Sequence, residues 1–146
     1  MKTGEPFSGV VRQRSQLGRA MQQVELAAAA PAARESWLTD LQTSLEHLEV
    51  AFTRHTLEVE APGALLDQIV DRAPRLQRAV EGTKAENATI SAAISDVLAM
   101  FSADAASENH DTLRDGVMAL LIALSRHRQK GADLIYDAYD VDIGGY

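Results

Sequence analysis

The chain has 146 residues and carries 14 Lys and Arg against 21 Asp and Glu, which gives a net charge of −7. This length fits one domain. The acidic balance argues against a nucleic-acid partner, because phosphate recognition needs clustered positive charge. The sequence contains no Cys, which excludes disulfides, iron–sulfur clusters and thiol chemistry.

Hydrophobic residues make up 46% of the chain, aromatic residues only 5%, and there are four prolines. This composition predicts helices around an aliphatic core. The first residues lack the apolar region of a signal peptide, and no apolar run reaches the roughly 18–20 residues of a membrane span. We therefore expect an all-α cytoplasmic protein with no membrane partner.

Apolar residues recur at alternating steps of three and four along the chain, which is the spacing of helices that face the centre of a bundle. The first such segment begins at Val10 and ends before Pro31. The second covers residues 34–71, and Pro62 predicts a kink or a brief break within it.

The third segment starts near Pro74, a residue favoured in the first turn of a helix, and its apolar line ends at Phe101. Residues 102–111 are small and polar and are expected to connect it to the last helix, at about 113–140. Four amphipathic helices with short connections predict an antiparallel up-down-up-down four-helix bundle. We expect a single domain over residues 1–146, with a flexible arm at 1–9 and a tail at 141–146.

Three polar residues, His55, Asn87 and His127, occupy positions where the pattern calls for an apolar side chain. Counting about 1.5 Å per residue from the helix ends places them within roughly 5 Å of one height, with Arg14 of the first helix close to the same level. The pattern thus predicts one polar layer inside an aliphatic bundle. Burial beside Arg14 would keep both histidines neutral, unless Glu58 or Glu86 pairs with one of them.

Such a layer needs a physical reason, because a buried polar group without a partner costs about 1–3 kcal/mol. One explanation is a satisfied hydrogen-bond network that fixes the register of the helices. The other is a ligand or metal held between the helices, where bundles place their cofactors.

The sequence resembles the hemerythrin-like (HHE cation-binding) family, in an actinobacterial-type variant. Four stretches carry the resemblance: residues 47–66 (HLEVAFTRHTLEVEAPGALL), Pro74-Arg75-Leu76, Ala85-Glu86-Asn87 and residues 125–134 (SRHRQKGADL). The resemblance implies a four-helix bundle that holds iron between its helices. His55 and His127 match the family's histidines on the second and fourth helices, and Glu86 matches the carboxylate on the third.

The chain departs from the family's ligand pattern at several positions. Val59 stands four residues after His55, although Glu58 lies next to it, and Asn87 replaces a histidine. Arg14 or Ser15 stands where the first helix would supply a histidine. Iron and zinc sites need three or more protein ligands, so the usual di-iron centre is not expected, and the cofactor is left open, with iron or haem as candidates.

Other features point to no further chemistry. His47 is expected on a helix flank, His110 in the polar connection, and the basic cluster Arg126, Arg128 and Lys130 on the surface. Asp137, Asp140, Asp142 and Gly144 are faintly similar to a calcium loop but lack its later Glu. No P-loop, nucleophile-elbow or dinucleotide motif is present, so an enzyme is not expected.

Two functional hypotheses follow. In the first, the bundle binds a metal ion or haem through His55 and His127, with Glu58 and Glu86 as further metal ligands and Arg14 and Asn87 beside the cofactor, in a sensing, storage or gas-binding role. In the second, it is a metal-free structural or protein-interaction bundle that has lost an ancestral di-iron site. A small ligand or gas is the expected partner, and a protein partner stays open.

Overall fold

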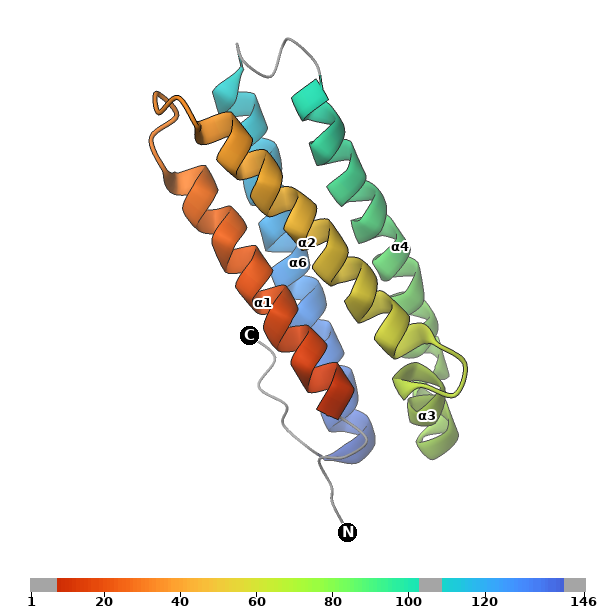
Figure 1. Cartoon of the computed structure of the whole chain (residues 1–146). Helices are drawn as coiled ribbons and strands as arrows, with labels where there is room; N and C mark the ends of the chain where they lie inside the picture. Colours follow the sequence, from red (N-terminus) through yellow and green to blue (C-terminus); the bar gives the residue numbers. More distant parts are fainter. Residues whose placement is uncertain (1–7, 103–108, 141–146) are drawn as a thin grey trace.

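The computed structural model describes residues 8–102 and 109–140. Four long helices make up the bundle: α1 (Ser8–Ala29), α2 (Trp37–Glu60), α4 (Gln77–Ala99) and α6 (His110–Tyr139). They run up, down, up and down (Figure 1), and no strand occurs in the described ranges. The all-α four-helix prediction is therefore confirmed. None of the helices in these ranges has a stretch long and apolar enough to cross a membrane.

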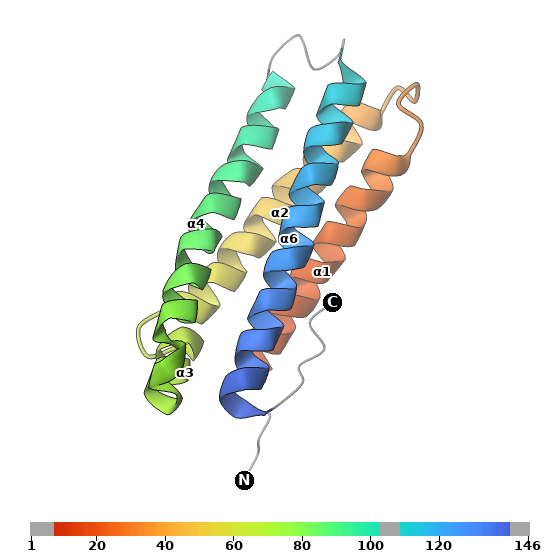
Figure 2. The same ribbon diagram turned by 180° about the vertical axis from the view of Figure 1, so that it is seen from behind.

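The helices form a ring in which each contacts two neighbours. α1 packs on α2, α2 on α4, α4 on α6, and α6 on α1. Seen from behind, α6 lies between α4 and α1 (Figure 2). The third predicted segment begins with a short 3-10 helix, η2 (Pro74–Leu76), which leads directly into α4, and another, η3 (Met100–Ser102), follows α4.

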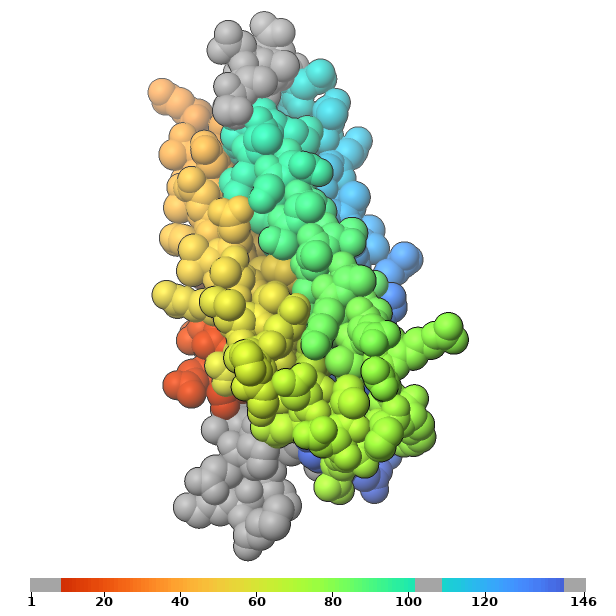
Figure 3. All heavy atoms as spheres, turned by 90° about the vertical axis from the view of Figure 1, so that its right-hand side faces the viewer, coloured from red at the N-terminus to blue at the C-terminus, as the bar shows by residue number. Residues whose placement is uncertain are grey.

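The break at Pro62 is complete. α2 ends at Glu60, and residues 65–72 form a separate helix, α3 (Leu65–Arg72). Gly63 adopts a φ of 75° between them, a left-handed conformation that glycine adopts without a steric penalty. Residues of α3 and the first turns of α4 cover the lower end of the bundle (Figure 3). Only the alternative of a break holds, and a continuous helix as far as residue 71 is wrong.

Arginines satisfy carbonyl groups at two helix ends, where the last turn has no partners of its own. Arg114 donates from Nε to the carbonyl of Ala28 and from Nη2 to that of Ala30, at the end of α1. Arg72 Nε donates to the carbonyl of Ala138 at the end of α6. These contacts tie the ends of distant helices together and place positive charge at the negative end of each helix dipole.

The apolar core has two parts. The larger cluster lies between the four long helices and includes Trp37, Phe52 and Leu124. The smaller lies under α3 and includes Ile69 and Val80. The residues predicted to form a polar layer lie where these two clusters meet.

Candidate functional site

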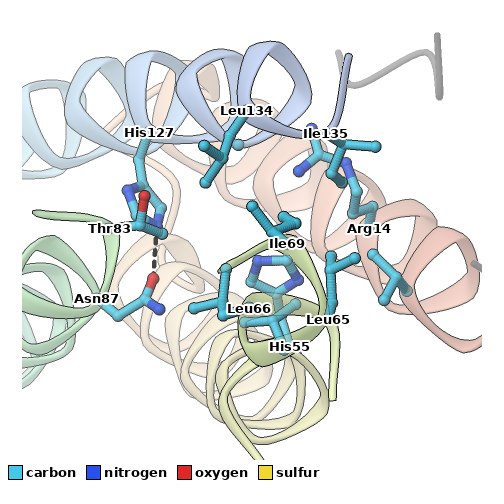
Figure 4. Close-up of a pocket in the computed structure, with 13 residues that line it drawn as sticks. Arg14, His55, Leu65, Leu66, Ile69, Thr83, Asn87, His127, Leu134 and Ile135 are labelled. Carbon is cyan, nitrogen blue, oxygen red and sulfur yellow. Dashed lines mark hydrogen bonds between the residues drawn. The ribbon is translucent and has the colours of Figure 1, made fainter. Parts of the chain in front are cut away.

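The structure brings all four predicted layer residues to the wall of one small cavity. Arg14, His55, Asn87 and His127 line a cavity of about 30 Å³, together with apolar residues of α1, α2, α3 and α6. Figure 4 shows His55 pointing into this space beneath α3, while His127 points toward Asn87. The four side chains are 5%, 6%, 1% and 4% exposed, respectively. The predicted polar layer is therefore present in the structure, and its side chains are buried.

The position predicted for His55 along the bundle needs a correction, because the count assumed that the second helix continues to residue 71. His55 is followed by only the five residues 56–60 before α2 ends. The layer consequently lies near the end of α2, and α3 folds back over it to supply the cavity wall through Leu65, Leu66 and Ile69. The four residues meet because the four long helices pack side by side, and the reversal of the chain after α2 places α3 over them.

His127 is held between two oxygen acceptors. Its Nδ1 lies 2.5 Å from Oε1 of Glu86, and its Nε2 lies 2.5 Å from Oδ1 of Asn87. The Asn87 amide donates from Nδ2 to Oε2 of Glu60 at 2.7 Å, which fixes its oxygen toward His127. Since an amide oxygen only accepts hydrogen bonds, Nε2 of His127 carries a proton.

Glu86 supplies the counter-charge at the other ring nitrogen. Burial by itself raises the pKa of Glu86, but hydrogen bonds from Lys130 and His127 outweigh it, and the pKa is lowered. Lys130 Nζ lies 2.9 Å from Oε2 of the same carboxylate. An ionised Glu86 offers Nδ1 of His127 a charged acceptor. The pairing with Glu86 that the sequence left open is therefore present at His127.

His55 is the opposite case. Its Nδ1 is buried and has no hydrogen-bond partner among the described residues. The pKa of His55 is lowered to about 3, first by burial and then by the positive charges of Arg14, His127 and Arg128. His55 is therefore neutral, and it presents an imidazole with unused hydrogen-bonding capacity to the cavity.

Two arginines cross between α1 and α6 beside the cavity. Arg14 Nη2 donates to the carbonyl of Arg128 at 2.8 Å, and Arg128 Nη2 donates to that of Arg14 at 3.3 Å. Arg128 is 8% exposed. Burial and then the charge of Arg128 lower the pKa of Arg14 to about 10, so both guanidinium groups remain charged at neutral pH.

Sequence reasoning missed two members of this group. Arg128 was expected on the surface with Arg126 and Lys130, but it is buried against α1, where Gly18 leaves room for its guanidinium. Glu60 was noted only as a flanking residue, but it orients the Asn87 amide. The sequence signal for the burial of Arg128 is Gly18, whose missing side chain leaves space for a long side chain. This signal can be used only when α1 and α6 are known to be neighbours.

The predicted metal ligands do not converge. Both ring nitrogens of His127 are occupied by Glu86 and Asn87, so no lone pair of this histidine faces the cavity. Glu58 lies instead beside Gly9, at the start of α1. Within residues 8–102 and 109–140, no group of three His, Asp or Glu side chains has the geometry to hold a metal ion.

A haem does not fit either. Cofactor-sized ligands occupy pockets of roughly 300–1,000 Å³, whereas the space between His55 and His127 is about 30 Å³. The side chain of Phe52 also contacts both imidazoles, with ring centroids 6.3 Å from His55 and 6.1 Å from His127. Among the residues that the structure describes, the arrangement around His55 and His127 therefore does not fit a metal ion or a haem.

The remaining histidines lie elsewhere. His47 is exposed on α2. His110 is the first residue of α6 and stacks on Trp37, with ring centroids 4.8 Å apart. Of the acidic tail, Asp142 and Gly144 lie outside the described residues.

Comparison with known proteins identifies no relative. No family model matches the chain, and neither a curated protein nor a solved structure matches it at a significant level. The structure establishes a four-helix protein with a buried polar layer, and the functional argument depends on this layer.

Proposed function

We propose that this protein is a metal-free helical bundle that binds a small ligand in the cavity of its polar layer. The observation that carries the proposal is His55, a buried imidazole that lines the cavity and whose Nδ1 has no hydrogen-bond partner among the described residues. A buried polar atom without a partner costs about 1–3 kcal/mol. A ligand with a complementary group would recover that free energy.

The size of the cavity limits the ligand. A cavity needs roughly 10–15 Å³ of such volume to hold one water molecule, so about 30 Å³ accommodates a molecule of one to three heavy atoms. Most of the lining is apolar, with Val10, Val59 and Leu134 among its residues. Polar groups on one side and aliphatic groups on the other are typical of a specific ligand site.

The cavity shares two of its lining residues with a groove on the surface. Thr83 and Leu134 line it and also line a larger groove between α4 and α6. That groove has a volume of about 400 Å³ and is bordered by Glu86 and Lys130. A small ligand would enter from the groove between Thr83 and Leu134, next to the pair that holds His127.

The resemblance to hemerythrin-like bundles fits the same proposal. In that interpretation the chain keeps the helix arrangement and the position of the family's site. Asn87 in place of a ligand histidine, and the protonated His127, would then convert the metal centre into a polar cavity. A sensing or storage role for the bound ligand is consistent with a cavity that has no catalytic group.

The direct test is to record amide ¹H–¹⁵N spectra of the full chain during titration with xenon, formamide, nitrite and chloride. The proposal predicts that at least one probe gives saturable shifts at residues of the polar layer. If all four probes leave these signals unchanged, the proposed function is wrong.

A pair of matched variants assigns the binding to the cavity. Val59→Ile adds one methylene group to the cavity wall, and Val24→Ile adds the same group to the larger core cluster. Overpacking costs stability in both proteins. Only Val59→Ile should abolish binding, and equal binding by the two variants would place the ligand elsewhere.

A further inference from the structure

We infer that the groove between α1 and α2 is a docking site for an acidic amphipathic helix of another protein. The two helices lie side by side along one face of the bundle (Figure 1). The groove between them, which we call the α1–α2 groove, has a volume of about 290 Å³. Its lining includes the basic side chains Arg19, His47 and Arg54 and the apolar side chains Ala20, Val50 and Ala51. These residues differ from those of the polar layer, so a partner in the groove would not occupy the small-ligand cavity.

The first observation is the positive charge of α1. This helix contains three arginines and one acidic residue, Glu25, whereas the whole chain has a net charge of −7. Arg12 and Arg19 are seven residues apart, which places them on one line along the helix, and both are exposed. An otherwise acidic protein thus presents a line of positive charge beside α2.

The arginines of the groove are not neutralised by the chain's own carboxylates. The ion pairs between described residues lie on α3, α4 and α6, and neither Arg19 nor Arg54 belongs to them. Of the residues that the structure describes, no Asp or Glu lines the groove. Glu58, one turn after Arg54, is directed against Gly9 at the start of α1, and Glu46 is exposed on α2 outside the lining. A partner that supplies carboxylates would therefore find both arginines free to pair.

The second observation is a line of exposed apolar side chains next to these charges. Val50 and Leu57 of α2 are seven residues apart, and they are 49% and 65% exposed, although valine and leucine are usually buried. Between this line and α1, the small residues Ala20 and Ala51 form the floor of the groove and leave room for a close approach. An amphipathic helix laid into the groove would cover these side chains and place its acidic flank against the arginines.

Charge favours a different protein over a second copy of this chain or a membrane. In a symmetric dimer the same surface would meet itself, so Arg19 and Arg54 would face identical arginines, and like charges repel. An anionic bilayer extends beyond the groove and would also meet the rest of a chain whose net charge is −7. In addition, the described residues of the lining include no Trp, Tyr or Phe, the side chains that anchor a protein at a bilayer surface. An acidic helix contacts only the groove and avoids both conflicts.

The test uses two blocked peptides of about 18 residues, which form about five helical turns. Both carry leucine at alternating steps of three and four, with alanine at half of the other positions. The remaining positions are glutamate in the first peptide and glutamine in the second. The full chain is titrated with each at low salt, and amide ¹H–¹⁵N shifts of residues 16–23 and 47–54 report binding. We expect the glutamate peptide to saturate these shifts at a concentration at least about fivefold lower, because only its side chains form charged pairs with arginine.

The inference is wrong if neither peptide binds, if both bind equally well, or if the shifts map outside the α1–α2 groove. Binding to vesicles that contain phosphatidylglycerol, without binding of the glutamate peptide, would assign the surface to a membrane instead. A dimer in sedimentation velocity whose contacts map to residues 16–23 and 47–54 would assign it to a second copy of the chain. All of these results leave the proposed small-ligand function standing, because that function is tested with other probes at other residues.

Matched variants separate the groove from the rest of the charged surface. Arg19→Gln combined with Arg54→Gln removes two charges from the groove, and Arg78→Gln combined with Arg126→Gln removes two from α4 and α6. All four arginines are exposed, so both proteins should fold. The groove variant should weaken binding of the glutamate peptide at least about tenfold, and the control less than about twofold. Equal losses in the two variants would contradict the docking site.

The apolar contact is tested in the same way. Val50→Ser removes an exposed apolar side chain that lines the groove, and Val11→Ser removes one from α1 that lies outside the lining. Only Val50→Ser should weaken binding of the glutamate peptide, by at least about threefold, because its side chain is covered by the docked helix. Unchanged affinity in Val50→Ser would mean that no helix lies in the groove.

Discussion

Arg14 and Arg128 each donate a hydrogen bond to the backbone carbonyl of the other, across the contact between α1 and α6. Each guanidinium also lies against a glycine of the opposite helix. A Cβ added at Gly18 would lie 3.1 Å from Nη2 of Arg128, and one added at Gly131 would lie 3.2 Å from Nη1 of Arg14. Two buried positive charges are thereby fixed next to one cavity.

This arrangement predicts unequal effects of Gly→Ala substitutions. In an open helical position, Ala stabilises by up to about 1 kcal/mol over Gly. Gly82→Ala meets no atom within 4 Å and should show this gain. Gly18→Ala and Gly131→Ala crowd the buried guanidinium groups, so each should be about 1–2 kcal/mol less stable than Gly82→Ala. Urea denaturation measures the three free energies of unfolding, and equal gains at all three positions would contradict the crossed arginine pair.

The lowered pKa of His55 predicts that stability falls in acid. Its folded pKa of about 3 lies below the ordinary value of 6.5, so between these values the unfolded chain binds more protons. The stability contributed by neutral His55 is complete above about pH 6.5 and is lost as the pH falls toward 3. Between pH 7.5 and 5 the loss should be about 2 kcal/mol.

His55→Leu should flatten this dependence, because leucine does not titrate. His47→Leu removes an exposed histidine from the same helix and is the control. Denaturation curves recorded from pH 7.5 to 5 should show the smaller slope only in His55→Leu. Parallel slopes in the wild type and His55→Leu would mean that this imidazole is not buried as the structure shows.

The acceptors around His127 predict a charged ring at neutral pH. In histidine ring ¹⁵N spectra at pH 7, both nitrogens of His127 should appear protonated, whereas His55 should appear neutral. Glu86→Gln removes the counter-charge, and His127 should then lose its proton, with a cost of about 1–3 kcal/mol in the free energy of unfolding. Glu81→Gln, an exposed position on the same helix, should change neither the spectrum nor the stability. A neutral His127 in the wild type would refute the assignment of the network.

The possible metal ligands around the cavity predict that the protein does not need a metal ion for its stability. Both ring nitrogens of His127 are engaged by Glu86 and Asn87, and among the described residues no three His, Asp or Glu side chains converge on one point, which is fewer than a metal site needs. Treatment with EDTA, or addition of Fe(II) or Zn(II) at equimolar concentration, should leave the melting temperature unchanged within about 1 °C. Elemental analysis of the purified protein should find no bound metal. A stoichiometric metal, or a large loss of melting temperature in EDTA, would restore the metal-binding hypothesis.

The sequence by itself predicted the helical segments, the inward-facing side of each and the burial of His55, Asn87 and His127. These properties follow from periodicity, because the spacing of apolar residues along one helix fixes which face is buried. His55, Asn87 and His127 interrupt that spacing, so their burial could be predicted before any neighbour was known. Arg14 was added to the layer because it lies between Val10 and Leu17 on the apolar line of the first helix and at a similar height.

The tertiary structure decided how those residues interact. Periodicity gives the buried face of a helix but not the side chain that meets it from another helix. The burial of Arg128 depends on Gly18 of α1, and the hydrogen bonds of His127 depend on Glu86 and on an Asn87 amide that Glu60 orients. The cavity exists because α3 turns back at Gly63 to cover the layer. Hydrogen-bond geometry across helices, which no single helix encodes, thus decides which atoms of the polar layer are engaged by a neighbour.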